Sequence, residues 1–200
     1  MEVLECDLIA NADFGYADDV VIYRARVKVS DVGSQAQEMI DTISDTSWLN
    51  SLSLVSKHTY AARAKGTIEK LVNGILQKVQ DTVTEEFGEY LVSSSAQQAV
   101  KQKLGHKPFP LAELLKEKIT GNPGFDFHTE SHTGYITFGE AKYSGSSSPY
   151  ANALTQILQF IGEGKDTMEF EIVENFASEA AIAKALAGEK RSGPHCSDRK

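Results

Sequence analysis

The chain has 200 residues, of which 41% are hydrophobic and 24% charged, with 15 glycines and 5 prolines. This composition excludes a collagen-like chain, a coiled coil and a wholly disordered chain, and the length suits one domain or a core with an appendage. The formal net charge of −8 argues against a protein that binds nucleic acid through its overall charge, whereas local basic patches and a metal site remain compatible with it.

The sequence predicts neither a membrane-spanning segment nor a secretory signal. No stretch approaches the length of apolar sequence that a transmembrane helix needs, and the first residues are acidic where a signal would be basic and then apolar. The two cysteines, Cys6 and Cys196, lie at opposite ends and form no metal-ligand or redox motif. We therefore expect a cytoplasmic protein with free thiols and no membrane partner.

The N-terminal third begins with a predicted antiparallel hairpin. Residues 20–29 are rich in β-branched side chains and alternate from Tyr23 onward, residues 3–9 supply the partner strand, and turn-forming residues separate the two. A short helix is predicted over residues 35–46, and residues 47–60 are ambiguous.

The middle of the chain has helical periodicity. Between residues 61 and 80, apolar side chains recur at the spacing of one helix face, although two glycines weaken the pattern. Further helices are predicted over residues 84–92, 97–104 and 111–119, with prolines between the last two.

The pattern then changes to strands. Residues 125–129 and 135–143 form a predicted hairpin, which a polar loop and a helix over residues 150–161 follow. The remaining predicted elements are a strand over 168–173, a helix over 178–187 and a frayed tail over 192–200.

These elements predict an α+β protein with a mixed sheet flanked by helices. We divide the chain into an N-terminal appendage of a hairpin and a helix (1–60), a core (61–191) and a tail (192–200).

One triplet in the second strand carries chemistry. The pattern Glu-x-Lys occurs twice, and its second copy, Glu163 to Lys165, lies between glycines after a helix, as expected of a solvated loop. Glu140 and Lys142 instead end an otherwise apolar strand, where alternation places them on one face with Ile136 and Phe138. Charges on such a face are costly unless they are paired or bind an ion.

Asp126 completes a candidate metal site. It lies at the start of the preceding strand, so an antiparallel turn near residues 131–133 brings it beside Glu140. Adjacent carboxylates raise each other's pKa, and a divalent cation removes that repulsion. Oxygen ligands on a sheet suit Mg²⁺ or Mn²⁺, and Lys142 could orient a water and stabilise charge on a phosphate. The residues predict metal-assisted phosphodiester hydrolysis.

These residues resemble the PD-(D/E)XK nuclease superfamily, which has the restriction-endonuclease-like fold. Asp126 matches the first acid of its motif and Glu140-Ala141-Lys142 the (D/E)XK, over a resemblance that spans roughly residues 61–173. The family core runs helix, three strands, helix, strand. The chain departs from it in Phe125, where the motif has proline, and in lacking a clear first core strand, which either lies in residues 47–60 or is replaced by the N-terminal hairpin.

The resemblance implies roles for further residues. Asp126 and Glu140 would hold the cation with the Ala141 carbonyl, and Lys142 would position the attacking water. Glu69 is the candidate for the acid that many members carry on the first core helix, and Gln156 fits loosely the glutamine of the exonuclease branch. Both residues could also be ordinary polar residues on helix surfaces, with no catalytic role.

Residues 124–128 and 139–143, followed by an alanine-leucine helix, also resemble the nuclease subunit of Hachiman-type anti-phage systems, which works with a helicase. No ATP-binding Gly-x-x-x-x-Gly-Lys-Ser/Thr motif is present, so any energy-driven translocation would need another chain.

Histidines and lysines offer secondary candidates. A zinc site at His128 and His132 is less plausible than solvated histidines at a hairpin tip, but His128 could contact a substrate phosphate because alternation places it with Asp126 and Glu130. Basic side chains in two stretches could guide nucleic acid, or could be ordinary solvated helix faces. They are Arg63, Lys65, Lys70 and Lys78, then Lys101, Lys103, Lys107, Lys116 and Lys118.

The sequence therefore favours a Mg²⁺-dependent nuclease, acting on DNA rather than RNA, as a subunit of an anti-phage complex with a helicase-like or other DNA-tracking partner. Two alternatives stay open. One is a catalytically inactive or structural subunit of the same fold, and the other is an acidic adaptor or immunity protein that binds a protein partner.

Overall fold

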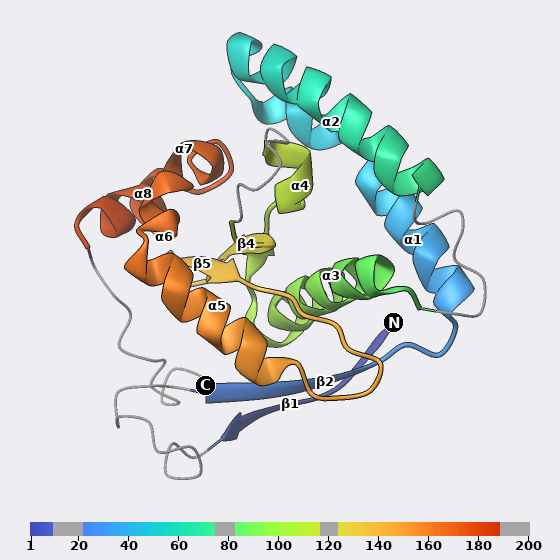
Figure 1. Ribbon diagram of the computed structural model, residues 1–200. Helices are drawn as coiled ribbons and strands as arrows, with labels where there is room; N and C mark the ends of the chain where they lie inside the picture. Colours follow the sequence, from blue (N-terminus) through green and yellow to red (C-terminus); the bar gives the residue numbers. More distant parts are fainter. Residues whose placement is uncertain (10–21, 75–82, 117–123, 189–200) are drawn as a thin grey trace.

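A computed structural model describes residues 1–9, 22–74, 83–116 and 124–188 (Figure 1). The protein is α+β, as the sequence predicts, with helices around two small antiparallel sheets. Within the described ranges, no helix is both long enough and apolar enough to cross a membrane.

The first sheet is the predicted N-terminal hairpin. Strand β1 (Glu2–Ile9) pairs antiparallel with β2 (Ile22–Lys28), which confirms the predicted pairing. Two arginines of β2 lie directly opposite acidic residues of β1 and form ion pairs with them, Arg24 with Asp7 and Arg26 with Glu5. Helix α3 (Glu85–Leu104) packs against both strands, so it lies between this hairpin and the second sheet (Figure 1).

The helices before the second sheet differ from prediction mainly in their ends. Helix α1 (Val32–Ser44) confirms the predicted short helix and begins where the Asp31 side chain accepts a hydrogen bond from the Ser34 N–H (2.8 Å). The ambiguous residues form the 3₁₀ helix η2 (Ser47–Ser51) and the start of α2 (Leu54–Gly74). The two helices predicted over 84–104 are one, α3, because its three central serines do not interrupt it and Ser93 is buried.

The second sheet supports the candidate site. Its strand order is β3 (Lys107–Pro108), β4 (Phe127–Glu130) and β5 (Ile136–Gly139), all antiparallel, with the short helix α4 (Ala112–Leu115) between β3 and β4. The predicted β4–β5 hairpin is confirmed, although both strands are shorter. Both expectations for the first core strand are wrong, since residues 47–60 are helical and the hairpin forms its own sheet. The strand that pairs with β4 is β3.

The chain after β5 is helical. Helices α5 (Tyr150–Gly162) and α8 (Glu179–Leu186) confirm two predicted helices. The predicted strand over 168–173 is wrong, because these residues end α6 (Lys165–Met168) and form α7 (Phe170–Val173). Val173 and Phe176, three residues apart as on one side of a helix, both lie in the core. The predicted tail lies outside the described residues, as do the ends of the helices predicted over 61–80 and 111–119.

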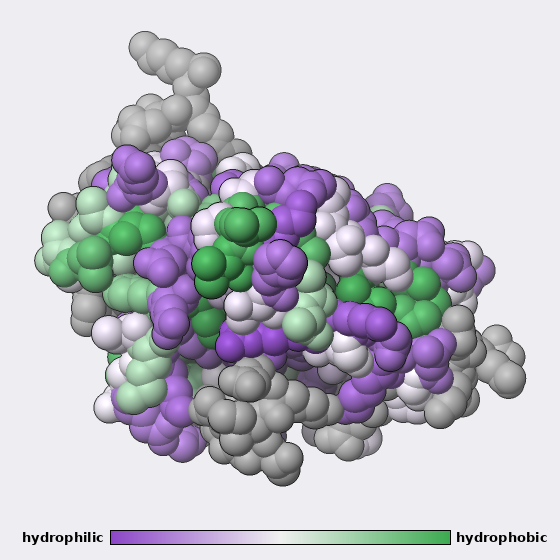
Figure 2. Space-filling view, turned by 90° about the horizontal axis from the view of Figure 1, so that it is seen from above, coloured by the Kyte–Doolittle hydropathy of each residue, from purple (hydrophilic) through white to green (hydrophobic). Residues whose placement is uncertain are grey.

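Two hydrophobic clusters hold these layers together. The first joins residues from both sides of the domain boundary predicted at residue 60: Ala36, Met39, Ile43, Leu71, Phe87, Leu111 and Leu114. The second lies under α7 and includes Leu49, Tyr60, Phe109, Leu115, Val173 and Phe176. The face seen from the α2 side is mostly hydrophilic, with separate hydrophobic patches (Figure 2).

Candidate functional site

Asp126 and Glu140 are neighbours across the β4–β5 hairpin. The strands pair with Phe127 opposite Gly139, so the next step outward brings Asp126 to Glu140. The Asp126 N–H donates to the Gly139 carbonyl (2.8 Å), and Asp126 Oδ2 accepts a hydrogen bond from the Ala141 N–H (2.7 Å). These two bonds attach Asp126 to the residues on either side of Glu140, as the predicted juxtaposition requires.

Glu140 and Lys142 contact each other. Lys142 Nζ lies 2.7 Å from Glu140 Oε1 and 3.8 Å from Glu89 Oε1, the latter on α3. The Glu140 side chain is only 1% exposed. Its second oxygen, Oε2, is buried and has no hydrogen-bond partner among the described residues. A buried carboxylate oxygen without a donor is costly, and a cation is one group that would satisfy it.

Strand alternation does not extend to these charges. Phe138 packs with His128 and Phe170, on the side of α6 and α7, whereas Glu140 pairs with Lys142 beside α3. The predicted common face of Phe138 and Glu140 is therefore wrong, because β5 ends at Gly139 and the backbone beyond it no longer follows the pleat.

The charges of the site are strongly perturbed. Burial raises the pKa of Glu140 to about 7, and the Asp126 carboxylate adds to this effect while Lys142 opposes it. Burial also raises the pKa of Asp126, against the hydrogen bond from Ala141. Burial lowers the pKa of Lys142, but the hydrogen bond to Glu140 and the negative charges of Glu140, Glu89 and Asp126 together leave the pKa above its ordinary value. Carboxyls perturbed in this way are common where a protein binds a cation or moves a proton.

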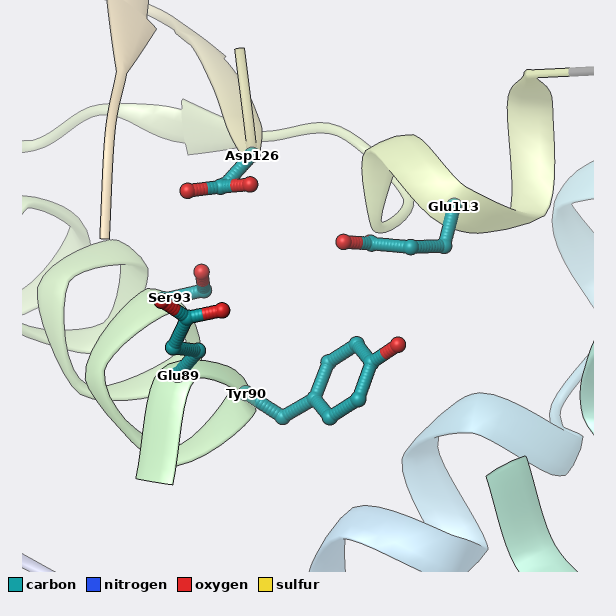
Figure 3. A pocket seen from close by; sticks show the side chains of 5 residues that line it. All are labelled: Glu89, Tyr90, Ser93, Glu113 and Asp126. Atoms are coloured by element: carbon teal, nitrogen blue, oxygen red, sulfur yellow. The ribbon is translucent and has the colours of Figure 1, made fainter. Parts of the chain in front are cut away.

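A small pocket adjoins Asp126. Side chains of α3, α4 and Asp126 line it (Figure 3): Glu89, Tyr90, Ser93, Glu113 and Asp126. Its volume is about 60 Å³, which holds a few water molecules but not a nucleotide. Glu113 Oε2 is buried with no hydrogen-bond partner in the described part of the chain, and burial raises the Glu113 pKa to about 7.

Comparisons of the chain with protein-family models, curated proteins and solved structures find no match.

The structure separates the remaining predicted residues from this pocket. Glu69 is exposed on α2, and Gln156 is half-buried on α5. Of the predicted site residues, Asp126 lines the pocket, whereas Glu140, Lys142, Glu69 and Gln156 are not among its lining residues. The acid that α3 brings to the site is Glu89, which sequence reasoning missed along with Glu113. One signal was available for Glu89. It follows Gly88, and the missing side chain there lets the ring of Tyr143, one residue after Lys142, lie directly against α3.

His128 does not reach a substrate. Its side chain is fully buried, and its Nε2 lies 2.6 Å from Glu169 Oε2. Asp126 does not share the predicted face, because it precedes β4 and lines the pocket with α3 and α4, whereas His128 and Glu130 bond to Glu169 and Ser178. His132 is exposed in the turn, and its Nδ1 lies 3.2 Å from the Leu104 carbonyl oxygen. Among the described residues, neither histidine belongs to a group of side chains that could hold a zinc ion.

The acids fit a cation only in part. Across the residues that the structure describes, no group of three or more His, Cys, Asp or Glu side chains is arranged to hold a metal ion. Mg²⁺ does not require such a group, since it commonly binds through one or two carboxylates and keeps several waters. Asp126 and Glu140, with one oxygen already unsatisfied, meet that smaller requirement.

Proposed function

We propose that the protein is a Mg²⁺-dependent nuclease, with Mn²⁺ as an alternative ion, built on a restriction-endonuclease-like core. The observation that carries the proposal is the buried, unpartnered oxygen of Glu140 beside Asp126, next to a lysine that contacts the same glutamate. Two acids and one lysine of this kind are the groups that hydrolysis of a phosphodiester bond with metal assistance needs.

Each residue has a role in this proposal. Asp126 and Glu140 hold the cation, with the Ala141 carbonyl as a third ligand. The bound ion would neutralise the charge that develops on the phosphate. Lys142 orients the attacking water, and Glu89, which lies near Lys142, keeps that ammonium group at the site. Glu113 lines the pocket beside Asp126 and holds or accepts a proton there.

The arrangement of elements supports part of the fold assignment. Helix α3, the antiparallel strands β3, β4 and β5, and helix α5 come in the order of the family core, with the short helix α4 inserted between β3 and β4. The helix next to the sheet is α3 rather than the predicted helix over 61–80. In the described residues the fourth core strand is missing, because helices occupy its predicted position.

We propose DNA, rather than RNA, as the substrate, and a helicase-like or other DNA-tracking protein as the partner. The pocket is too small to enclose a nucleotide, so a phosphodiester would have to approach at its mouth. Several of the predicted basic side chains serve the protein itself. Lys107 donates to the Phe176 carbonyl (2.7 Å), and Lys116 pairs with Glu169 (2.8 Å). Fewer cations are left to contact DNA than the sequence suggests, which favours delivery of the strand by another chain.

The ion pair itself favours a second candidate. Because Lys142 already satisfies one oxygen of Glu140, the acids and the lysine could be structural groups of an inactive subunit. The active nuclease and the inactive subunit differ in how a cation changes the stability of the protein. An active site gains stability from Mg²⁺ through Asp126 and Glu140, whereas a structural ion pair does not.

The test combines binding and cleavage. Thermal unfolding of the protein is measured with and without Mg²⁺, and duplex and single-stranded DNA are incubated with protein freed of contaminating nucleases. We expect Mg²⁺ to raise the unfolding temperature and to support cleavage. A wild-type protein that neither gains stability from Mg²⁺ or Mn²⁺ nor cleaves DNA with its partner present would favour the inactive subunit.

A further inference from the structure

A second group of charged side chains lies buried behind Asp126. Lys116 follows α4, His128 lies on β4, and Glu169 links α6 to α7, so three distant segments meet here. Glu169 is 6% exposed and His128 0%. Lys116 Nζ lies 2.8 Å from Glu169 Oε1, and His128 Nε2 lies 2.6 Å from Glu169 Oε2.

This group holds the backbone immediately before Asp126. Lys116 Nζ donates to the Phe125 carbonyl (2.5 Å), and the Phe125 N–H donates to Glu169 Oε1 (3.2 Å). Both backbone polar groups of Phe125 are thus bonded to the same ion pair. The Phe125 ring adds a hydrophobic anchor, since it packs against Phe138 (4.9 Å between centroids) and Phe160 (5.3 Å).

Gly124 is required for this arrangement. A Cβ at this position would collide with Glu169 Oε1 and Lys116 Nζ. The Lys116–Glu169 ion pair therefore lies directly against the backbone of Gly124, where the absence of a side chain leaves space for it.

The charges within the group are balanced. Burial raises the pKa of Glu169, but the hydrogen bond with His128 and the charge of Lys116 outweigh burial, so its pKa is below the ordinary value. Glu169 is then ionised opposite one permanent cation. His128 donates through Nε2, and its Nδ1 is buried with no hydrogen-bond partner among the described residues. The ionised Glu169 and the Lys116 ammonium thus offset each other's charge within the group.

We propose that Lys116, His128 and Glu169 form a positioning triad, whose function is to fix the Phe125 backbone so that Asp126 reaches the Ala141 N–H and the pocket. The proposal concerns positioning residues and not catalytic ones, and its functional meaning rests on the proposed nuclease site. Its structural content is independent of that site, because the Asp126–Ala141 hydrogen bond is observable without metal or substrate.

The experiment follows the Ala141 amide by NMR in the full chain without metal. Lys116→Met removes the donor to the Phe125 carbonyl, and Glu169→Gln removes the charge that pairs with it. We expect exchange of the Ala141 amide proton to accelerate about 5- to 10-fold in both variants, the factor that losing one hydrogen bond gives. Lys116→Arg keeps a cationic donor and should restore most of the protection.

Lys107→Met is the matched control. It also removes a lysine that donates to a backbone carbonyl, that of Phe176, but outside the triad. We expect Ala141 exchange to stay within about twofold of wild type in this variant. Gly124→Ala offers an independent disturbance, since it pushes the triad apart without removing any of its charges.

Two outcomes would overturn the proposal. One is unchanged Ala141 exchange in folded Lys116→Met and Gly124→Ala proteins. The other is acceleration of the Ala141 amide by no more than that of amides far from the triad, such as Ala187, which would indicate general destabilisation. A protein that binds no Mg²⁺ and cleaves no DNA would refute the proposed function and leave this result intact, so the two failures are distinguishable.

Discussion

Asp126 accepts a hydrogen bond from the N–H of Ala141, 15 residues later in the chain, over 2.7 Å. The bond fixes Asp126, directly before β4, to the backbone that carries Glu140, directly after β5. The spacing of the two acids is therefore set where the paired strands end, and such a fixed spacing favours a role that needs defined geometry.

Glu140→Gln should abolish the proposed cleavage without harm to the fold. The substitution removes the charge that would bind the cation, and we expect the rate to fall by about two orders of magnitude or more. The free energy of unfolding should hold or rise, because a buried carboxylate is replaced by a neutral amide and Lys142 keeps Glu89 nearby. Lys142→Ala should be similarly inactive. Cleavage assays and urea unfolding of each protein check these outcomes.

Glu163→Gln is the control for that experiment, since Glu163 belongs to the second Glu-x-Lys triplet and is exposed. It should leave cleavage at the wild-type rate. Equal cleavage by the wild type, Glu140→Gln and Lys142→Ala would exclude the assignment.

Glu89 and Glu69 should differ in importance. Glu89 lines the pocket and lies 3.8 Å from Lys142, whereas Glu69 is exposed on α2. We expect Glu89→Gln to lower the rate of cleavage at least about tenfold, as loss of a charged contact in a site commonly does, and Glu69→Gln to have no effect. Rates for the two single variants decide between them, and a larger loss in Glu69→Gln would restore the original candidate.

The free energy of unfolding should fall as the pH rises, because of Glu113. Its pKa is raised from 4.5 to about 7 in the folded protein, so between these values the folded state keeps a proton that the unfolded chain has released. Its contribution is complete below pH 4.5 and is lost as pH rises through about 7. Relative to Glu113→Gln, the wild type should lose on the order of 2 kcal/mol between pH 5 and 8. Parallel stability curves for the two proteins would contradict this.

Gly88 should not tolerate alanine. Its Cβ would fall within the ring of Tyr143, so Gly88→Ala must move α3 away from the end of β5, at a cost of about 1–3 kcal/mol. Gly66 is the matched control on α2. A Cβ there meets nothing within 4 Å, and Gly66→Ala should stabilise the protein by about 0.5–1 kcal/mol. Chemical denaturation measures both, and equal effects would show that the Tyr143 contact has no energetic weight.

The isolated chain should bind duplex DNA weakly. Its net charge is −8, and Lys107 and Lys116 are engaged within the protein. Affinity that rests on few phosphate contacts falls steeply with salt, so we expect no sub-micromolar binding at about 150 mM salt. Fluorescence anisotropy with a labelled duplex measures it. Tight binding and rapid cleavage by the lone chain would show that no delivering partner is needed.

The sequence predicts best where local signals agree. The hairpins β1–β2 and β4–β5 could be predicted because alternation, β-branched residues and turn residues coincide. The turn near residues 131–133, and with it the pairing that brings Asp126 beside Glu140, followed from these signals. Glu140 and Lys142 do contact each other, but not through the alternation that predicted it, because β5 ends at Gly139.

What could not be predicted depends on tertiary packing. Only the preceding Gly88 marks Glu89, and Glu113 and Glu169 have no local pattern that separates them from the other glutamates. The packing of α3, α4 and α7 around the sheet is what distinguishes these three acids. The predicted strand over 168–173 is wrong for the same reason, since tertiary packing of Val173 and Phe176 in the core accompanies short helices there.

The position of Glu169 has a consequence for how such proteins are recognised and dissected. All the motif residues lie between Asp126 and Lys142, so a fragment that ends after α5 would contain every one of them. It would lack the carboxylate that bonds to the Phe125 N–H and to Lys116. A search by motif, or a truncation guided by one, would then retain the chemistry of the site and discard the support that keeps Asp126 in place.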